Sequence, residues 1–167
     1  MQQAISVTWL ALAAVLQVTV APHVKLLSGL PNLVLVSVLA WALIRGPMAG
    51  LRWAIVGGLL LDVVGQEPFG VHTFALVVVA YFAGFGERAL FRANQPFAML
   101  VVAAATLLYY LVVLLLMGAL GYPVSFSHGL VQVAVPSSVL NALLTPLAAL
   151  ALNWMDRRFP LPVQPAW

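Results

Sequence analysis

Only a few residues of this chain could take part in chemistry, and they lie in or next to long apolar segments. Asp62 is the one acidic residue that falls inside such a segment. A carboxylate in a membrane is costly and usually faces the protein interior with a partner. We expect its partners on the same side of the membrane, and the candidates are Asn32, His72, His128 and Lys25. Such a cluster would either bind a proton or a cation, or form hydrogen bonds that lock helix ends together.

These residue types give no support for metal binding or hydrolysis. The histidines, His23, His72 and His128, include no pair at short ligand spacing, and the chain has no cysteine to supply a thiolate. Phosphate-binding, zinc-protease and serine-hydrolase motifs are also missing from the sequence. No second carboxylate in an apolar segment is available to pair with Asp62. The sequence therefore predicts a protein that is not an enzyme and that needs no cofactor or metal.

Small residues recur ahead of Asp62 and form a second candidate site. Gly50, Ala54, Gly58 and Asp62 are spaced by four, and about 3.6 residues per turn keeps such a row close to one helix face. Gly57 widens this face. Small residues let helix backbones approach closely, which is the main packing device in a membrane. The face is either a docking surface for a partner's helix or a contact between helices of this chain.

The last apolar segment combines prolines with polar side chains. Asn141, Thr145 and Asn153 accompany Pro136 and Pro146 in this part of the sequence. A proline frees backbone groups of a membrane helix, and nearby polar side chains can satisfy them. We therefore interpret the polar residues as supports for kinks, with a water-filled path beside them as the alternative.

The composition indicates that these residues belong to an all-α integral membrane protein. Hydrophobic residues make up 64% of the chain and charged residues only 7%, whereas soluble domains carry about a quarter charged residues. Crossing a hydrocarbon core of roughly 30 Å takes about 20 helical residues. The 167 residues therefore have room for one domain of six transmembrane helices. The predicted spans are about 4–21, 30–44, 48–64, 71–85, 97–117 and 130–152.

The arginines predict the orientation of these spans. They fall in pairs in the second gap, in the fourth gap and after the last span, and they are Arg45, Arg52, Arg88, Arg92, Arg157 and Arg158. Cytoplasmic loops retain Lys and Arg, so both termini are predicted to be cytoplasmic. This topology also explains the net charge of +3, and no nucleic-acid site is expected.

The second apolar segment, 30–44, is short for a membrane crossing. A re-entrant hairpin is the alternative, but it would place the later arginine pairs on the outer side. We therefore predict a true span that begins at Pro31, since proline is favourable at the first helical position.

Three short motifs share their order and spacing with a known family. The first, PNLVL, begins at Pro31 and opens a span, and the second, GGLLLD, ends at Asp62 and closes the next span. The third, PFGVH, contains Pro68 and Gly70 and follows a short linker. Their arrangement resembles the MreD family of rod shape-determining membrane proteins, whose chain length and span number also fit. Asn32 stands where that family often has aspartate.

The resemblance implies a non-enzymatic scaffold subunit of the bacterial cell-elongation machinery in the inner membrane. The implied partners are MreC, whose single membrane helix the subunit would hold, MreB, and RodA with its transpeptidase, besides membrane lipids. The resemblance also implies a six-helix fold like that of the substrate-binding components of energy-coupling-factor transporters. Association between copies of the chain stays open.

Two other functions are compatible with the same fold class, since fold does not determine function. A vitamin-binding transporter component is one of them, but those components share two alanines four residues apart on the first span, and this chain has no such pair there. A proton-coupled carrier is the other, with Asp62 as its proton site. In that case Asp62→Asn would abolish uptake without affecting folding.

Overall fold

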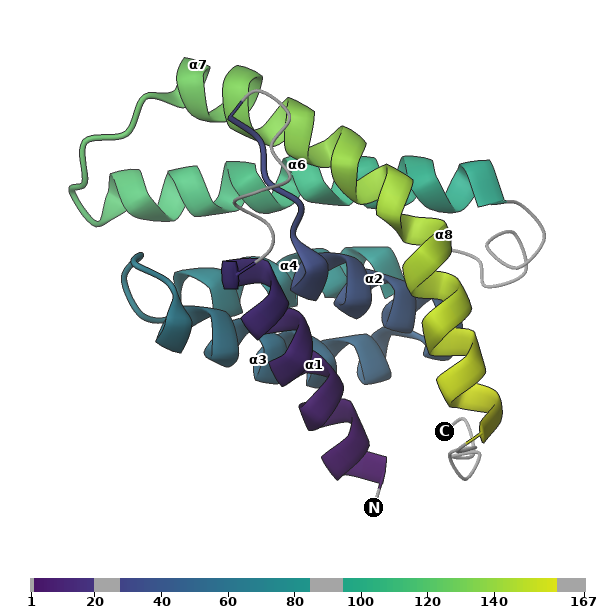
Figure 1. Ribbon diagram of the computed structural model, residues 1–167. Helices are drawn as coiled ribbons and strands as arrows, with labels where there is room; N and C mark the ends of the chain where they lie inside the picture. Colours follow the sequence, from purple (N-terminus) through teal and green to yellow (C-terminus); the bar gives the residue numbers. More distant parts are fainter. Residues whose placement is uncertain (1, 20–27, 85–94, 159–167) are drawn as a thin grey trace.

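The described part of the chain consists of helices joined by short connections (Figure 1). The computed structural model describes residues 2–19, 28–84 and 95–158, of which residues 2–6 are described as backbone only. No β-strand occurs in these ranges. The long helices are α1 (Gln2–Thr19), α2 (Leu33–Arg45), α3 (Pro47–Val64), α4 (Val71–Gly84), α6 (Gln95–Ala119) and α8 (Val135–Arg158). The short α7 (Phe126–His128) and the π-helical η2 (Gly129–Ala134) lead directly into α8.

Helix α2 is the centre of the bundle. Every residue from Val34 to Ile44 is buried, and α1, α3, α4, α6 and α8 all contact the helix. A helix that is apolar on all sides is stable only when it is surrounded by other apolar groups. The surrounding helices supply those groups, which explains why this 13-residue helix can be short.

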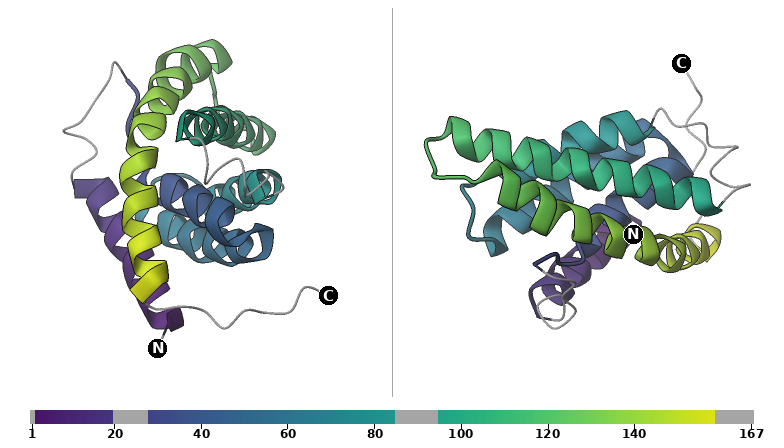
Figure 2. Two further views of the ribbon diagram at one scale, coloured as in Figure 1. Left: turned by 90° about the vertical axis from the view of Figure 1, so that its right-hand side faces the viewer. Right: turned by 90° about the horizontal axis from the view of Figure 1, so that it is seen from above.

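The surrounding helices have two orientations. Figures 1 and 2 show α2, α3, α4 and α6 running nearly side by side, whereas α1 and α8 cross them obliquely. Helix α1 contacts α2 and α3, and α8 contacts α2 and α6. The two oblique helices therefore flank the central helix, and this arrangement shapes the surface between them.

The boundaries of α2 have clear local causes. The side-chain oxygen of Asn32 accepts a hydrogen bond from the backbone N–H of Leu35, at 2.8 Å, so Asn32 is the N-cap of the helix. Pro31 thus lies before the cap and not at the first helical position, which corrects the sequence prediction. At the other end, Gly46 has a φ of 97° and Pro47 begins α3 at once. Glycine tolerates this left-handed conformation, so one residue suffices to connect the two helices.

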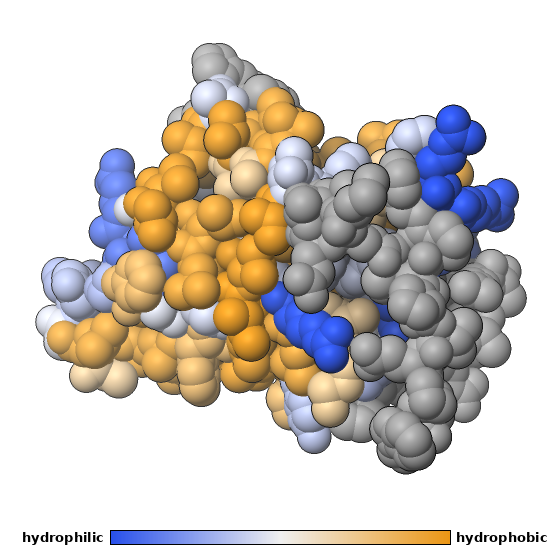
Figure 3. Space-filling model, turned by 90° about the horizontal axis from the view of Figure 1, so that it is seen from below, coloured by the Kyte–Doolittle hydropathy of each residue, from blue (hydrophilic) through white to orange (hydrophobic). Residues whose placement is uncertain are grey.

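The helices lie at all six predicted positions, and the protein is an all-α membrane protein. For the first five predicted spans, each helix end that the structure describes lies within three residues of the predicted end. Within the described residues, three helical stretches are long and apolar enough to cross a membrane: Pro47–Val64, Gln95–Ala119 and Phe126–Arg158. The shorter apolar stretches are Val7–Thr19 of α1, Leu33–Arg45 and Val71–Gly84. Figure 3 shows a broad hydrophobic surface that is bordered by hydrophilic side chains.

Candidate functional site

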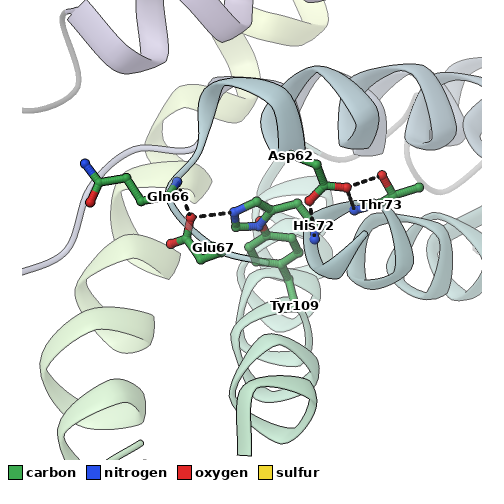
Figure 4. Close-up of polar contacts among 6 residues, drawn as sticks. All are labelled: Asp62, Gln66, Glu67, His72, Thr73 and Tyr109. Atoms are coloured by element: carbon green, nitrogen blue, oxygen red, sulfur yellow. Dashed lines mark hydrogen bonds and ion pairs between the residues drawn. The ribbon is translucent and has the colours of Figure 1, made fainter. Parts of the chain in front are cut away.

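Asp62 connects the end of α3 to the beginning of α4 (Figure 4). One carboxylate oxygen accepts the backbone N–H of His72 at 2.9 Å, and the other accepts the backbone N–H of Thr73 at 3.2 Å. The Thr73 hydroxyl donates to that second oxygen at 2.5 Å. The first N–H groups of a helix have no partner in their own helix, and the helix N-terminus favours negative charge. Asp62 therefore caps α4 from a neighbouring helix.

Of the partners expected for Asp62, only His72 bonds to it, and it does so through the backbone and not through the imidazole ring. Asn32 instead caps α2. His128 is exposed on α7, and no hydrogen bond joins it to Asp62 in the described residues. Lys25 lies outside the described residues. The geometry thus shows hydrogen bonds that lock α3 to α4, and the predicted four-residue cluster does not form.

The imidazole ring of His72 lies between two other polar side chains (Figure 4). Its Nδ1 is 2.6 Å from the hydroxyl of Tyr109 on α6, and its Nε2 is 3.1 Å from a carboxylate oxygen of Glu67 in the α3–α4 turn. An ionised carboxylate only accepts hydrogen bonds, so Nε2 donates to Glu67. In the neutral ring Nδ1 then accepts from the Tyr109 hydroxyl. The three side chains form one chain of hydrogen bonds from the turn into the bundle.

The hydrogen bond from His72 lowers the pKa of the Glu67 carboxyl from 4.5 to about 2. Because the pKa is lower in the folded state, this contribution to stability is complete above about pH 4.5 and is lost as the pH falls toward 2. The side chain is 41% exposed, so solvent screening limits the loss to about 1 kcal/mol.

We expect Glu67→Gln to remove this pH dependence. The measurement is the free energy of unfolding of wild type and variant in detergent micelles. At pH 5 the wild type should be the more stable of the two, and at pH 2.5 their stabilities should converge. An equal difference at both pH values would contradict the stabilising hydrogen bond between Glu67 and His72.

A second polar cluster joins α2, α6 and α8 in the interior. The backbone N–H of Asn32 donates to the side-chain oxygen of Asn141 at 2.8 Å, and the Asn141 amide donates to the hydroxyl of Thr106 at 3.2 Å. Asn141 and Thr106 are fully buried. The interpretation of Asn141 as a kink support is therefore wrong, because both ends of its side chain bind other helices. Thr145 does donate to a backbone carbonyl of α8, that of Asn141.

The small residues of α3 pack inside the chain. A Cβ atom at Gly58 would lie 2.3 Å from Thr73 Cα, and one at Gly50 would lie 2.4 Å from Ala42 Cβ. Gly57 faces Val34 in the same way. The face made by these glycines together with Ala54 and Asp62 is consequently covered by α1, α2 and α4. It is a packing face within the protein, and the interpretation as a free docking surface is corrected.

The turn that contains Pro68 and Gly70 begins α4. Gly70 has a φ of 97°, and its carbonyl accepts the backbone N–H of Phe74 at 2.9 Å. The carbonyl of Pro68 accepts the backbone N–H of Val71 at 3.2 Å. This turn holds Glu67 beside His72, so the third motif positions the side chains of the site.

An ion pair at the opposite end of the bundle escaped sequence reasoning. Arg45 at the end of α2 pairs with Asp156 near the end of α8. The guanidinium also lies over the ring of Trp41, 5.7 Å from its centroid, and Trp41 stacks on Trp53 of α3. The pair explains why α8 extends beyond the predicted end of the last span, since Asp156 is held against a neighbouring helix.

Fold and sites together define a helical membrane protein whose interior polar groups join its helices. The family model described as rod shape-determining protein MreD matches residues 1–154, and the chain belongs to this family. It is accordingly a rod shape-determining membrane protein. None of the curated proteins matches the chain.

Proposed function

We propose that the chain is a scaffold subunit of the bacterial cell-elongation complex in the inner membrane, without enzymatic activity of its own. In this role it holds the single membrane helix of MreC and presents the outer domain of MreC to RodA and its transpeptidase, close to MreB. The observation that carries the proposal is the match of the MreD family over residues 1–154.

The interior polar groups support a structural role. Asp62 caps α4, and Asn141 joins α2 to α6 and α8. In the described part of the chain, no fully buried side-chain nitrogen or oxygen lacks a hydrogen-bond partner. A small-molecule site usually presents a few polar groups to its ligand, whereas these groups are engaged with the protein itself. This favours a scaffold over a vitamin-binding component or a carrier that uses Asp62.

We further propose that the chain crosses the membrane six times with both termini in the cytoplasm. The pair between Arg45 and Asp156 places the C-terminal ends of α2 and α8 together. Arg157 and Arg158 lie in the last turn of α8, at the same end of the molecule. Cytoplasmic loops retain arginine, which supports a cytoplasmic position for this end.

An apolar groove between α1 and α8 is the proposed seat of the MreC helix. It has a volume of about 230 Å³, and α2 contributes its remaining lining. On α8 it is lined by Leu144, Leu147, Ala148 and Ala151, which are three or four positions apart and so share one face. Ala13 on α1 and the two alanines on α8 allow the close approach of a further backbone. Paired helical faces with small residues favour a helix over a lipid chain as occupant.

We expect Ala148→Leu to reduce the binding of MreC about tenfold, because the larger side chain fills the groove at a cost of about 1–3 kcal/mol. The measurement is the ratio of MreC to this chain after affinity purification from membranes. Ala104→Leu is the matched control, since Ala104 is exposed on α6 and does not line the groove.

Each result of this purification bears on a separate part of the proposal. Full retention of MreC by Ala148→Leu would show that the groove holds something else, such as lipid. Failure of the wild-type chain to co-purify with MreC would overturn the scaffold function itself.

A further inference from the structure

The groove between α1 and α8 contains a single hydroxyl group. It belongs to Ser37, the only residue of α2 with a hydroxyl, which lines the groove and is 4% exposed. Among the lining residues only Trp9 of α1 has another polar side-chain atom, and its indole Nε1–H donates to Ser37 Oγ at 3.3 Å. All other lining side chains are those of leucine, valine and alanine. The groove is therefore an apolar surface with one polar position.

The hydroxyl hydrogen of Ser37 has no acceptor in the described part of the chain. A serine hydroxyl donates one hydrogen bond and accepts up to two. The Ser37 oxygen accepts the indole N–H of Trp9, but Ser37 itself donates to no other described residue. Hydroxyl groups in helices often donate to the carbonyl four residues earlier, as Thr106 does to Val102. Ser37 makes no such bond, so one hydrogen-bond donor in the groove is unused.

An unused donor favours an occupant with an acceptor. A polar group without a partner is unfavourable in apolar surroundings, and hydroxyl groups of membrane helices form hydrogen bonds to neighbouring helices. The acyl chain of a lipid offers no acceptor, whereas a helix can offer one in its side chains. Because Ser37 is almost completely buried beneath the walls of the groove, a side chain must reach into the groove to meet it.

We infer that the helix bound in this groove carries a serine, threonine, asparagine or glutamine whose side-chain oxygen accepts a hydrogen bond from Ser37. The inference rests on the proposed function, because it takes the membrane helix of MreC as the occupant. It adds the register of that helix, since the residue with the acceptor lies opposite Ser37. Apolar residues on either side of it then contact the leucines of the walls, which are Leu12, Leu16, Leu144 and Leu147.

Trp9 contributes to this site by its position. Its indole N–H points at the Ser37 oxygen, so the hydroxyl hydrogen of Ser37 must point away from the indole. The bond also joins α1 to α2 at the groove. Trp9 is thus a positioning residue for the donor, and the acceptor itself has to come from the partner.

Disulfide cross-linking tests the register directly. The chain has no cysteine, so Ser37→Cys introduces its only thiol with little change in side-chain size. This variant is combined in membranes with full-length MreC variants that each carry one cysteine along the membrane helix. A disulfide requires Cα atoms within about 7 Å of each other. We expect cross-linking to be strongest at one position of MreC, and the natural residue there to be serine, threonine, asparagine or glutamine.

The affinity of wild-type MreC measures the hydrogen bond itself. We expect Ser37→Ala to weaken binding about threefold to tenfold, which is the range for hydrogen bonds between membrane helices. The matched control is Ser138→Ala, because the Ser138 hydroxyl donates to the carbonyl of Val135 in its own helix and lies outside the groove. The control should bind MreC as the wild type does.

A double-mutant cycle separates the hydrogen bond from the loss of the Trp9 contact. Replacing the cross-linked residue of MreC by alanine should weaken binding as much as Ser37→Ala does, and the two changes together should weaken it no further. Fully additive losses would overturn the inference, and so would strongest cross-linking at an apolar residue of MreC.

The inference and the proposed function fail in different ways. If Ser37→Cys forms no cross-link while Leu147→Cys on the wall of the groove does, the groove holds MreC but Ser37 does not meet it, and only the inference is overturned. If neither variant cross-links and wild-type MreC does not co-purify, the scaffold function is overturned and the inference with it. The cross-linking result decides even if Ser37→Ala fails to fold.

Discussion

Gly58→Ala is expected to destabilise the folded protein by about 3 kcal/mol, at the upper end of overpacking effects, although alanine is intrinsically better than glycine in a helix. The added Cβ would lie 2.3 Å from the Cα and 2.9 Å from the backbone nitrogen of Thr73. Because these are backbone atoms, no side-chain rotation relieves the clash, and α3 and α4 must move apart. The shift would also lengthen the bonds between Asp62 and α4. The free energy of unfolding in mixed micelles measures the effect.

Gly118→Ala is the matched control for this substitution. An added Cβ there would meet only side-chain atoms, the nearest at 3.4 Å from Val124. We expect this variant to be neutral or stabilised by up to about 1 kcal/mol, as helix propensity predicts. Equal stabilities of the two variants would contradict the close packing of α3 on α4. A Gly58→Leu protein that folds normally and loses only its partner would restore the docking interpretation.

The positions of the helices were predictable because each depends on its own stretch of sequence. A span is recognisable from a run of apolar residues, and the loops between spans from glycine, proline and charge. The last helix is the exception, since it continues to Arg158 beyond the predicted end at 152. Its continuation depends on the pair between Asp156 and Arg45, which are 111 residues apart.

The polar contacts were less predictable because they depend on which helices become neighbours. Asp62 was recognisable as a group that needs partners, and His72 was among the candidates. Glu67 and Tyr109 were missed, since the bond between Tyr109 and His72 joins residues 37 positions apart on helices whose packing no local pattern specifies. Their signals in the sequence were weak, namely a carboxylate in the turn before His72 and a tyrosine in an apolar span.

The row of small residues on α3 shows that the packing partner of a helix is equally hard to predict from sequence. Its spacing predicted a smooth face on α3, and the structure has that face. Whether a helix of the same chain or of another protein covers a smooth face depends on the remaining helices. Here α2 and α4 cover it with Ala42 and Thr73, so the surface left for a partner has to be sought elsewhere, between α1 and α8.

The second large effect is expected for Asp62→Ala, which should lower the free energy of unfolding by about 2–4 kcal/mol. The substitution leaves the partly buried backbone N–H groups of His72 and Thr73 without the acceptor that the buried Asp62 side chain supplies. Asp62→Asn should cost about half as much, because it keeps an acceptor oxygen but loses the charge that the N-terminus of α4 favours. Unfolding in micelles gives the stabilities, and hydrogen exchange at the two amides shows where the loss occurs.

Thr73→Val distinguishes the contribution of the two backbone hydrogen bonds to Asp62 from that of the Thr73 hydroxyl. It removes the hydroxyl that donates to Asp62 and leaves the backbone bonds in place, so we expect a loss of only about 1 kcal/mol. If Thr73→Val and Asp62→Ala were equally destabilising, the backbone bonds would not be the main contribution of Asp62. A carrier that uses Asp62 would behave differently again: Asp62→Asn would keep its full stability and its slow amide exchange while losing transport. Faster exchange at His72 and Thr73 in Asp62→Asn would instead identify the carboxylate as the group that holds α4 to α3.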